Sequence, residues 1–572
     1  MFGLHAADLT VLVLYLVGIT VLGVWTARRV HTAADFFMPR RFGKPMMMMH
    51  AFGTGTHSDQ AVSVASKTAS VGLSGIWYQW LWLFATPFYW LIAPVMRRFR
   101  AITTADVFEA RFDRSVAMLF ALVGMVQLMV NIGVMLKGSG AVIAGSTSGQ
   151  VSADLAIAVM TVLFVVYGVA GGLGAAIVTD FVQGLLTVVF SFLLLPYILG
   201  AAGGIAGLHE KIRDPQMFSL VAPAEIGVFY IVMIALNGLI GIVTQPHTMG
   251  NCAAGRTEMD GRVGFMGGTF VKRLCTAAWC LTGLAAVAYY GRAGLKPDEV
   301  YGQVAAEFLP KVVHGMLGLF LASLLASVMS SCDSFMVASS GLFTENLYKP
   351  LVAGRSERHY VTVGRIATVA IVAGGVVFAY RLPNVVEGLE IFWRIAPMMG
   401  IAFWLGLFWR RATPAGAWAA TLTGFGLWFL SDHALFIEWL RGLPWAEPLR
   451  LVFDKAQADG TTAAEMYLPW QMVFYLSGGT LAGIVVSLLT PRVADEKLEA
   501  FYALVRTPVR PGEPPTAPCT LPAGVAVQPR RKLIPLRSLE ILVPSWTSAA
   551  GFAAGWAIVV AIIAVFYWIS RG

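Results

Sequence analysis

The side chains best suited to chemistry gather in the middle of one long apolar stretch, residues 317–348. They are Ser327, Ser330, Ser331, Asp333 and Ser334. On a helix the serines follow the i, i+3, i+4, i+7 spacing, so they form one stripe. Lipid offers no hydrogen bonds, so such a stripe must face a wet cavity, a cation or another helix. Serine oxygens suit a hard cation such as sodium, and small serines also allow close helix contacts, so both interpretations stay open.

A second polar run, from Gly53 to Gln60, interrupts another apolar segment. Its glycines and its short polar side chains, which compete for backbone hydrogen bonds, make a poor continuous helix. We therefore predict an unwound stretch whose carbonyls point into a cavity. Within it, His57 and Asp59 form either a buried pair or half of a metal site, although no second cluster with ligand spacing accompanies them.

The elements that position these residues are membrane helices. The chain has 572 residues, is 57% hydrophobic and 13% charged, and has a mean hydropathy of +0.70, which excludes an ordinary soluble protein. We predict an all-α polytopic membrane protein with about fourteen crossings. The predicted spans are 8–28, 46–65, 74–96, 115–145, 152–170, 175–200, 226–246, 269–291, 314–346, 361–381, 387–409, 413–431, 470–490 and 548–570.

The basic residues fix an orientation for this topology. Most of the 41 Lys and Arg residues fall in the loops on one side, including residues 491–540, which we interpret as a cytoplasmic linker. The rule that positive loops stay inside then places both termini outside the plasma (cell inner) membrane, with a polar outer loop at 432–468. The net charge of +9 is therefore a product of topology, and we expect no nucleic-acid partner.

The N-terminal segment and the cysteines give two further expectations about this membrane protein. The first 24 residues lack a basic start and a small-residue cleavage site, so we expect a retained helix. The five cysteines form no closely spaced pairs, so no disulfide or metal framework is indicated.

Three motifs together resemble the sodium:solute symporters. The run from Gly171 to Gln183 is similar to the family's GGL-x-A-x-x-x-TD-x-x-Q motif, and Ser327–Ser331 with Phe343–Tyr348 resembles its sodium-site helix and exit. The resemblance covers most of the chain. It implies a LeuT-type fold with inverted five-helix repeats at 44–200 and 226–409. Around them we expect an extra helix at 1–30, helices 12 and 13 at 413–490, the linker at 491–540 and a last helix at 548–570.

The resemblance also implies sodium ligands. The common site would use the carbonyls of His57, Gln60 and Ser327 with the hydroxyls of Ser330 and Ser331. Some members hold a second sodium ion, and the matching positions here are Asp180, Ser331, Asp333 and Ser334. A carboxylate beside serine hydroxyls favours two sodium sites over one, although an aspartate at a helix start also stabilises the helix dipole.

Within the family, the sodium/sugar branch gives the nearest local matches. They imply solute contacts from Gln79, Asn131, Asn237, Lys272 and Glu390, with Asp59 added from the broken helix. The chain departs from that branch because Ile240 replaces a gate tyrosine and His57 and Asp59 replace small or amide residues. Sugar stacking on Trp77, Trp80, Trp82 or Trp393 competes with a packing role for these rings.

Lys137 and Arg394 lie within predicted helices and indicate a different solute, a carboxylate or an amino acid. Glu390 lies four residues before Arg394, so an intrahelical pair is the alternative.

We therefore expect a sodium-coupled symporter of a small polar solute, sugar-like in the first instance, and no enzyme. A membrane sensor without transport is the alternative from another class. The expected partners are sodium, the solute and the lipid bilayer, with the chain a monomer or weak homodimer.

Overall fold

The computed structural model describes residues 4–28, 38–168, 172–222, 225–456, 462–510, 512–513, 516–527, 529 and 531–571. It is a bundle of helices with one small hairpin, so the predicted helical class is confirmed. Residues 29–30 of the expected first segment, Gly171 of the glycine-rich motif, and Pro511, Pro514 and Pro515 of the expected linker lie outside the described residues.

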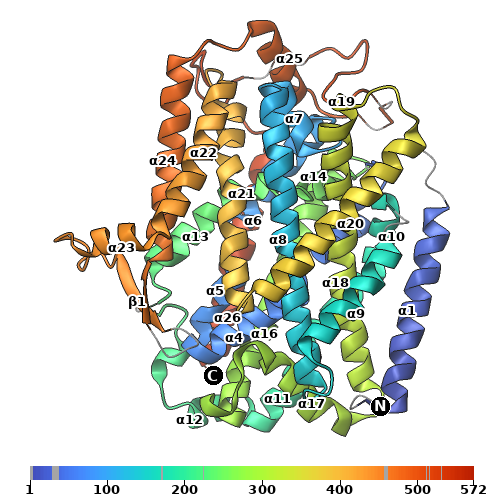
Figure 1. The fold of residues 1–572 in the computed structure, drawn as a ribbon, viewed down its shortest axis with the longest axis vertical. Coiled ribbons are helices and arrows are strands. Elements are labelled where there is room, and N and C mark those ends of the chain that lie inside the picture. Colours follow the sequence, from blue (N-terminus) through green and yellow to red (C-terminus); the bar gives the residue numbers. More distant parts are fainter. Residues whose placement is uncertain are drawn as a thin grey trace.

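Nine helical stretches among the described residues are long and apolar enough to cross a membrane. Most of them run along the long axis of the molecule, and the one at residues 357–381 crosses it obliquely (Figure 1). They are built on α1 (Ala6–Ala27), α8 (Arg114–Ser146), α10 (Gly172–Phe192), α16 (Gly268–Tyr290), α18 (Met316–Gly341), α20 (Glu357–Arg381), α21 (Val385–Phe408), α24 (Leu468–Leu489) and α26 (Trp546–Arg571).

The other five predicted crossings coincide with helices that are interrupted, shorter or less apolar. They are the pair α3 (Lys44–Thr54) and α4 (Ser58–Val71), then α6 (Thr86–Arg98), α9 (Ala153–Gly168), α13 (Val228–Gly241) and α22 (Pro414–Ser431). The count of fourteen and the boundaries of the inverted repeats therefore stay predictions.

Short elements connect the long helices. The short α-helices are α5 (Trp77–Trp80), α7 (Thr104–Arg111), α11 (Leu195–Ala202), α12 (Gly204–Lys211), α14 (Thr248–Ala253), α15 (Glu258–Arg262), α17 (Val300–Val312), α19 (Lys349–Leu351), α23 (Ala434–Arg441) and α25 (Asp495–Arg506). Two π-helical turns lie at Val263–Gly267 and Leu342–Tyr348. The 3-10 turns lie at Gly72–Ile76, Pro215–Phe218, Ile242–Thr244, Arg292–Gly294 and Pro297–Glu299. In the predicted outer loop, β1 (Val452–Ala456) pairs antiparallel with β2 (Thr462–Met466).

Capping residues determine where several of these helices begin. Thr103 and Asp106 form a reciprocal cap at the start of α7, and Asn384 caps α21. Thr413 caps α22, whose first residue is Pro414, where a missing N–H costs nothing.

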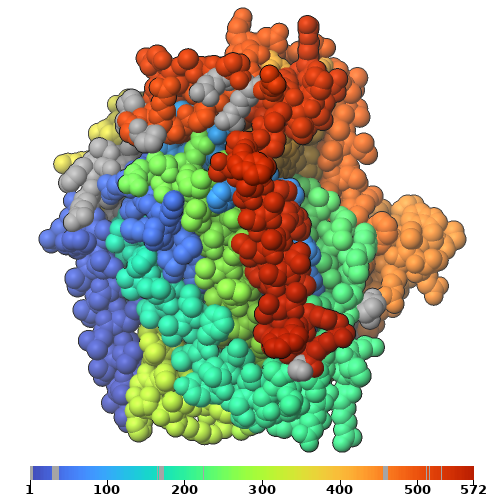
Figure 2. Space-filling model, turned by 180° about the vertical axis from the view of Figure 1, so that it is seen from behind, coloured from blue at the N-terminus to red at the C-terminus, as the bar shows by residue number. Residues whose placement is uncertain are grey.

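Burial separates a central helix from the peripheral ones. The most apolar window of Met316–Leu351 is 83% buried, whereas those of α1 and α26 are 17% buried. Figure 2 shows α26 lying along the outside of the bundle. Its Trp568 and the Leu14 of α1 are largely exposed. These two helices therefore turn apolar surface towards lipid, while α18 is held in the protein core.

At the end of the bundle that carries α25, the carboxylate of Glu540 pairs with three basic side chains. Glu540 accepts hydrogen bonds from Arg410 at 2.7 Å, Arg506 at 2.6 Å and Lys532 at 2.9 Å. Burial raises the pKa of Glu540, but the hydrogen bonds from Arg506, Lys532 and Arg410 outweigh it and hold the pKa below its ordinary range. The expected linker is therefore tied to the bundle by a charge cluster.

We predict that Glu540→Gln loosens this end of the molecule, because it leaves three cations without their shared carboxylate, at a cost of about 1–3 kcal/mol. The thermal unfolding midpoint of the purified protein should fall. Since the pKa of Glu540 is depressed in the folded protein, the stabilisation is present above its ordinary pKa and is lost as the pH falls through the depressed value.

Glu499→Gln is the matched control. Glu499 pairs with Arg410 and Arg506, but its side chain is 58% exposed, so its removal should change little. Equal shifts in the two variants would show that Glu540 has no special role.

Candidate functional site

The predicted break in the second membrane segment is present. Helix α3 ends at Thr54 and α4 begins at Ser58, and His57 has extended backbone angles between them. The side chains of His57 and Asp59 form a hydrogen-bonded pair at the start of α4. Of the two interpretations of these residues, the structure favours the buried pair, and the described residues contain no metal-binding cluster of His, Cys, Asp or Glu.

The serine stripe of α18 faces this break. The Ser331 hydroxyl lies 3.1 Å from the carbonyl of Gly53 and 3.2 Å from that of Ser327. The Ser334 hydroxyl lies 3.0 Å from that of Thr54. Thus α18 meets the last turn of α3 through polar contacts, which suit a cation site and a close helix contact alike.

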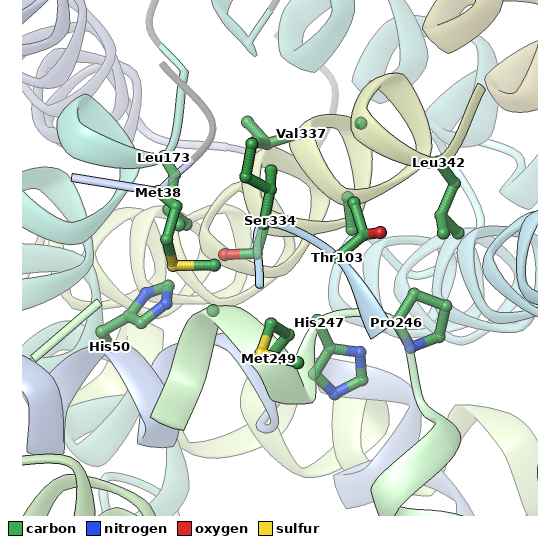
Figure 3. Close-up of a pocket in the computed structure, with 14 residues that line it drawn as sticks. Met38, His50, Thr103, Leu173, Pro246, His247, Met249, Ser334, Val337 and Leu342 are labelled. Carbon is green, nitrogen blue, oxygen red and sulfur yellow. The ribbon is translucent and has the colours of Figure 1, made fainter. Parts of the chain in front are cut away.

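A buried carboxylate closes the cluster from a third helix. Asp180 of α10 is fully buried and accepts a hydrogen bond from the Ser330 hydroxyl at 2.5 Å. Its other oxygen lies 2.6 Å from Nδ1 of His50 on α3. His50 and Ser334 also line a small cavity of about 30 Å³ beside Met38, Leu173 and Met249 (Figure 3).

These contacts bring together oxygen atoms of the kind that hard cations bind. The Gly53 and Ser327 carbonyls converge on the Ser331 hydroxyl, and the Ser330 hydroxyl keeps its lone pairs while it donates to Asp180. The carbonyl of His57 accepts the Gln60 N–H at 3.1 Å, so its role as a sodium ligand stays a prediction, as does that of Gln60. Asp333, next to the stripe, is also buried.

A polar cavity of about 60 Å³ lies on the other side of the break. Of the residues predicted to contact a solute, Asn131 and Lys272 line it. Lys272 donates a hydrogen bond to the carbonyl of Gly55, and its ammonium group lies 5.4 Å from the ring centroid of Trp82. Arg273 also lines the cavity, and no acidic side chain does so among the described residues. The cavity therefore has two basic side chains in its lining.

Several buried atoms on this cavity have no hydrogen-bond partner among the described residues. The acceptors are Oε1 of Gln60, Oδ1 of Asn131 and Oδ1 of Asn251, and the donors are Nε1 of Trp82 and Nε of Arg273. Unpaired buried polar groups are costly, so the cavity is suited to a ligand or waters that satisfy them.

The remaining predicted solute contacts do not line this cavity. Asp59 is fully buried and paired with His57. Asn237 donates to the Trp393 carbonyl at 2.9 Å and accepts from Tyr475 at 2.6 Å, so it is already satisfied. Glu390 accepts from Tyr78 at 2.9 Å and lies 3.8 Å from Arg394, which is the intrahelical pair. Gln79 is fully buried and does not line this cavity.

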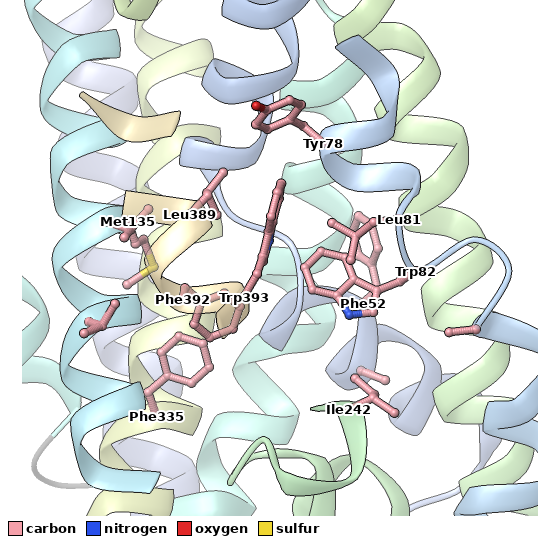
Figure 4. Packing of buried hydrophobic residues seen from close by; sticks show 14 of the residues in the cluster. Phe52, Tyr78, Leu81, Trp82, Met135, Ile242, Phe335, Leu389, Phe392 and Trp393 are labelled. Carbon is pink, nitrogen blue, oxygen red and sulfur yellow. The ribbon is translucent and has the colours of Figure 1, made fainter. Parts of the chain in front are cut away.

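Of the four tryptophans that were candidates to stack on a sugar, one lines the cavity and three do not. Trp82 lines the cavity and lies edge-on to Trp393, with ring centroids 6.4 Å apart (Figure 4). Trp77 donates to the Leu220 carbonyl at 2.7 Å, and Trp80 to that of Arg273 at 3.1 Å. Only Trp82 of the four lies where it could contact a solute in this cavity.

Sequence reasoning missed several residues that the structure brings to the site. His50 and Thr54 share one face of α3 at the i, i+4 spacing, which was a readable signal. Gly53, His247 and Asn251 gave no comparable signal, because a carbonyl contact and the approach of α14 depend on tertiary packing.

The model of the sodium:solute symporter family matches residues 36–424. The chain belongs to the sodium:solute symporter family. The family consists of sodium-coupled transporters, and the described helices are those of a multi-pass membrane protein. Sodium is therefore the coupling ion of this symporter.

The chain is similar to relatives that are named for different solutes. The symporter is 27% identical over 436 residues to the high-affinity proline transporter PutP of Bacillus subtilis, covering 71% of this chain and 88% of that one. It is 24% identical over 484 residues to sodium/myo-inositol cotransporter 2 of Sus scrofa, covering 74% and 69%. The structure of a sodium-coupled sialic acid symporter, in a substrate-bound outward-open state, matches with a TM-score of 0.66 at 18% identity, covering 86% of this chain and all of that one. The last likeness supports the LeuT-type fold.

We predict that Ser331→Ala raises the sodium concentration for half-maximal binding about tenfold. Loss of one ligand to a charged group costs roughly 1.5–3 kcal/mol. Binding of ²²Na⁺ to the purified symporter measures this directly.

Ser327→Ala is the control, because the Ser327 hydroxyl donates within its own helix, to the Leu324 carbonyl at 2.7 Å. Its sodium affinity should stay within about threefold of the wild-type value. An unchanged affinity in Ser331→Ala would remove this hydroxyl from the sodium site.

Proposed function

We propose that this symporter uses sodium entry to import a small polar organic solute by alternating access. The observation that carries the proposal is the convergence of the α18 serines on the broken end of α3. A sodium ion held there, by the Gly53 and Ser327 carbonyls with the hydroxyls of Ser330 and Ser331, would join two helices that must separate when the site opens inward. His57 and Gln60 remain candidates to complete its coordination.

The solute proposed is one that carries a carboxylate, either an anion or a zwitterion. Lys272 and Arg273 give the cavity positive charge, and the unpaired oxygens of Gln60, Asn131 and Asn251 suit donors elsewhere on the same solute. The relative named for proline supports this class, because proline has a carboxylate beside an ammonium group.

A sugar-like polyol is the second candidate. Asn131 lines the cavity with a free carbonyl oxygen, Trp82 offers an aromatic face, and one relative is named for myo-inositol. Since Gln79, Asn237 and Glu390 lie away from this cavity, fewer contacts support a sugar than the sequence indicates.

We further propose the plasma membrane as its location, with both termini outside. The described chain ends both lie towards the end of the bundle opposite α25 (Figure 1), which supports a common side for the two termini. The basic cluster around Glu540 lies at the α25 end and supports the cytoplasmic assignment of that end.

The driving force depends on the charge of the solute. A potential of ~100 mV supplies roughly 2.3 kcal/mol per charge, and a tenfold sodium gradient adds about 1.4 kcal/mol. One sodium ion therefore supports about 500-fold accumulation of a zwitterion. For a monovalent anion the potential cancels, and about tenfold remains.

Uptake into proteoliposomes tests the proposal. Labelled amino acids, monocarboxylates and polyols should be compared with an inward sodium gradient and with potassium in its place. We expect sodium-driven uptake of at least one carboxylate-bearing solute. Sodium-driven uptake of polyols alone would favour the second candidate, and no uptake of any kind would favour a sensor.

We predict that Lys272→Gln raises the solute concentration for half-maximal uptake at least tenfold, because a charge-assisted hydrogen bond in a buried site is worth about 1.5–3 kcal/mol. Sodium binding in the absence of solute should change little. Lys211→Gln, which alters an exposed lysine of α12, is the control. If Lys272→Gln transports normally while Asn131→Ala fails, the carboxylate assignment is wrong.

A further inference from the structure

The carboxylate of Asp180 poses an electrostatic problem. It is fully buried in a helix at membrane depth, where an uncompensated charge is very unfavourable. The sequence offers a second sodium ion as the compensation, held by Asp180 with Ser331, Asp333 and Ser334. The structure shows a hydrogen-bonding partner in that place, a histidine from α3.

Both oxygens of Asp180 are engaged by protein donors. Nδ1 of His50 lies 2.6 Å from Oδ2, and the Ser330 hydroxyl lies 2.5 Å from Oδ1. These are the short distances of hydrogen bonds to a charged acceptor. The carboxylate therefore has a partner on each oxygen without any bound cation.

The position of His50 is fixed by close packing. Its ring is fully buried, and Thr54, one helical turn later, lies 3.3 Å from the same ring nitrogen. A Cβ added to Gly53 would lie 2.5 Å from the Ser330 hydroxyl oxygen and 3.8 Å from Cβ of Asp180, so α3 fits tightly against this pair. A cation with five or six ligands does not fit between α3 and Asp180 while the ring is there.

Two of the serines expected around a second ion make their contacts away from Asp180. Ser331 lies against the carbonyls of Gly53 and Ser327, and Ser334 lies against Thr54. The cavity beside His50 is lined mostly by apolar side chains, among them Met38, Leu173 and Met249 (Figure 3), which are poor ligands for sodium.

We propose that the His50 imidazole takes the place of a second sodium ion at Asp180, so that this symporter binds one sodium ion per cycle. This inference rests on the proposed sodium-coupled function. In this arrangement the His50 side chain joins α3 to α10 by a direct hydrogen bond, where an ion would otherwise join them. The common site between α3 and α18 is left for the transported ion. Replacing His50 by a small hydroxyl side chain should then create the second site, because a ligand oxygen and the space of the ring become available beside Asp180.

Equilibrium binding of ²²Na⁺ to the purified full-length protein, without solute, tests the proposal by counting sites. The wild type should bind one sodium ion per chain with a Hill coefficient near one. His50→Ser should bind two, and His50→Ser combined with Asp180→Asn should return to one. His433→Ser, at an exposed histidine before α23, is the control and should also stay at one.

The outcomes separate this inference from the proposed function. Two sodium ions in the wild type would overturn the role of His50 and leave a sodium symporter intact. A folded His50→Ser that still binds one ion would overturn it as well. If His50→Ser does not fold, His50→Thr, which also places a hydroxyl beside Asp180, is counted instead: two sodium ions per chain support the inference, and one refutes it. Absence of saturable sodium binding in the wild type would reject the proposed function itself.

Discussion

The requirement that polar groups be satisfied inside the protein organises this structure around the broken end of α3. The last turn of α3 contacts α18 through Gly53 and Thr54 and contacts α10 through His50. Because lipid cannot solvate these groups, they are stable only where three helices enclose them. The burial of α18 follows from this, since a helix with such a polar stripe has no favourable lipid-facing orientation.

The same requirement explains how neighbouring helices approach the break. On α8, the Ser139 hydroxyl lies 2.5 Å from that of Ser58, the first residue of α4. One residue earlier, a Cβ on Gly138 would lie 2.5 Å from Cα of Asp59, so only glycine allows this approach. The non-helical backbone at Gly55–His57 is thus enclosed by protein and cavity, where carbonyls can be satisfied.

Two cavities with different chemistry flank this region. The smaller one, lined by His50, is mostly apolar, and His50 is hydrogen-bonded to Asp180. The larger one, beside Lys272, combines two basic side chains with unpaired hydrogen-bonding atoms. Satisfied polar groups give a rigid contact between helices, whereas unpaired polar atoms leave binding energy for a solute. The larger cavity is therefore the one that we propose for the solute.

The sequence by itself determined the features that depend on local pattern: the membrane class, from hydropathy; the break, from glycines and short polar residues within an apolar run; and the family, from motifs on α10 and α18. It could not assign partners to buried polar residues, because a side chain such as Asn237 can line a cavity or bond to a neighbouring helix, and only packing decides which. For the same reason, the family resemblance implied a sodium ion at Asp180, whereas only the tertiary structure shows the His50 ring within hydrogen-bonding distance of its carboxylate. Contacts between helices that are far apart in the sequence determine which hydrogen-bond donors lie beside a buried carboxylate. Those donors determine what the carboxylate can bind.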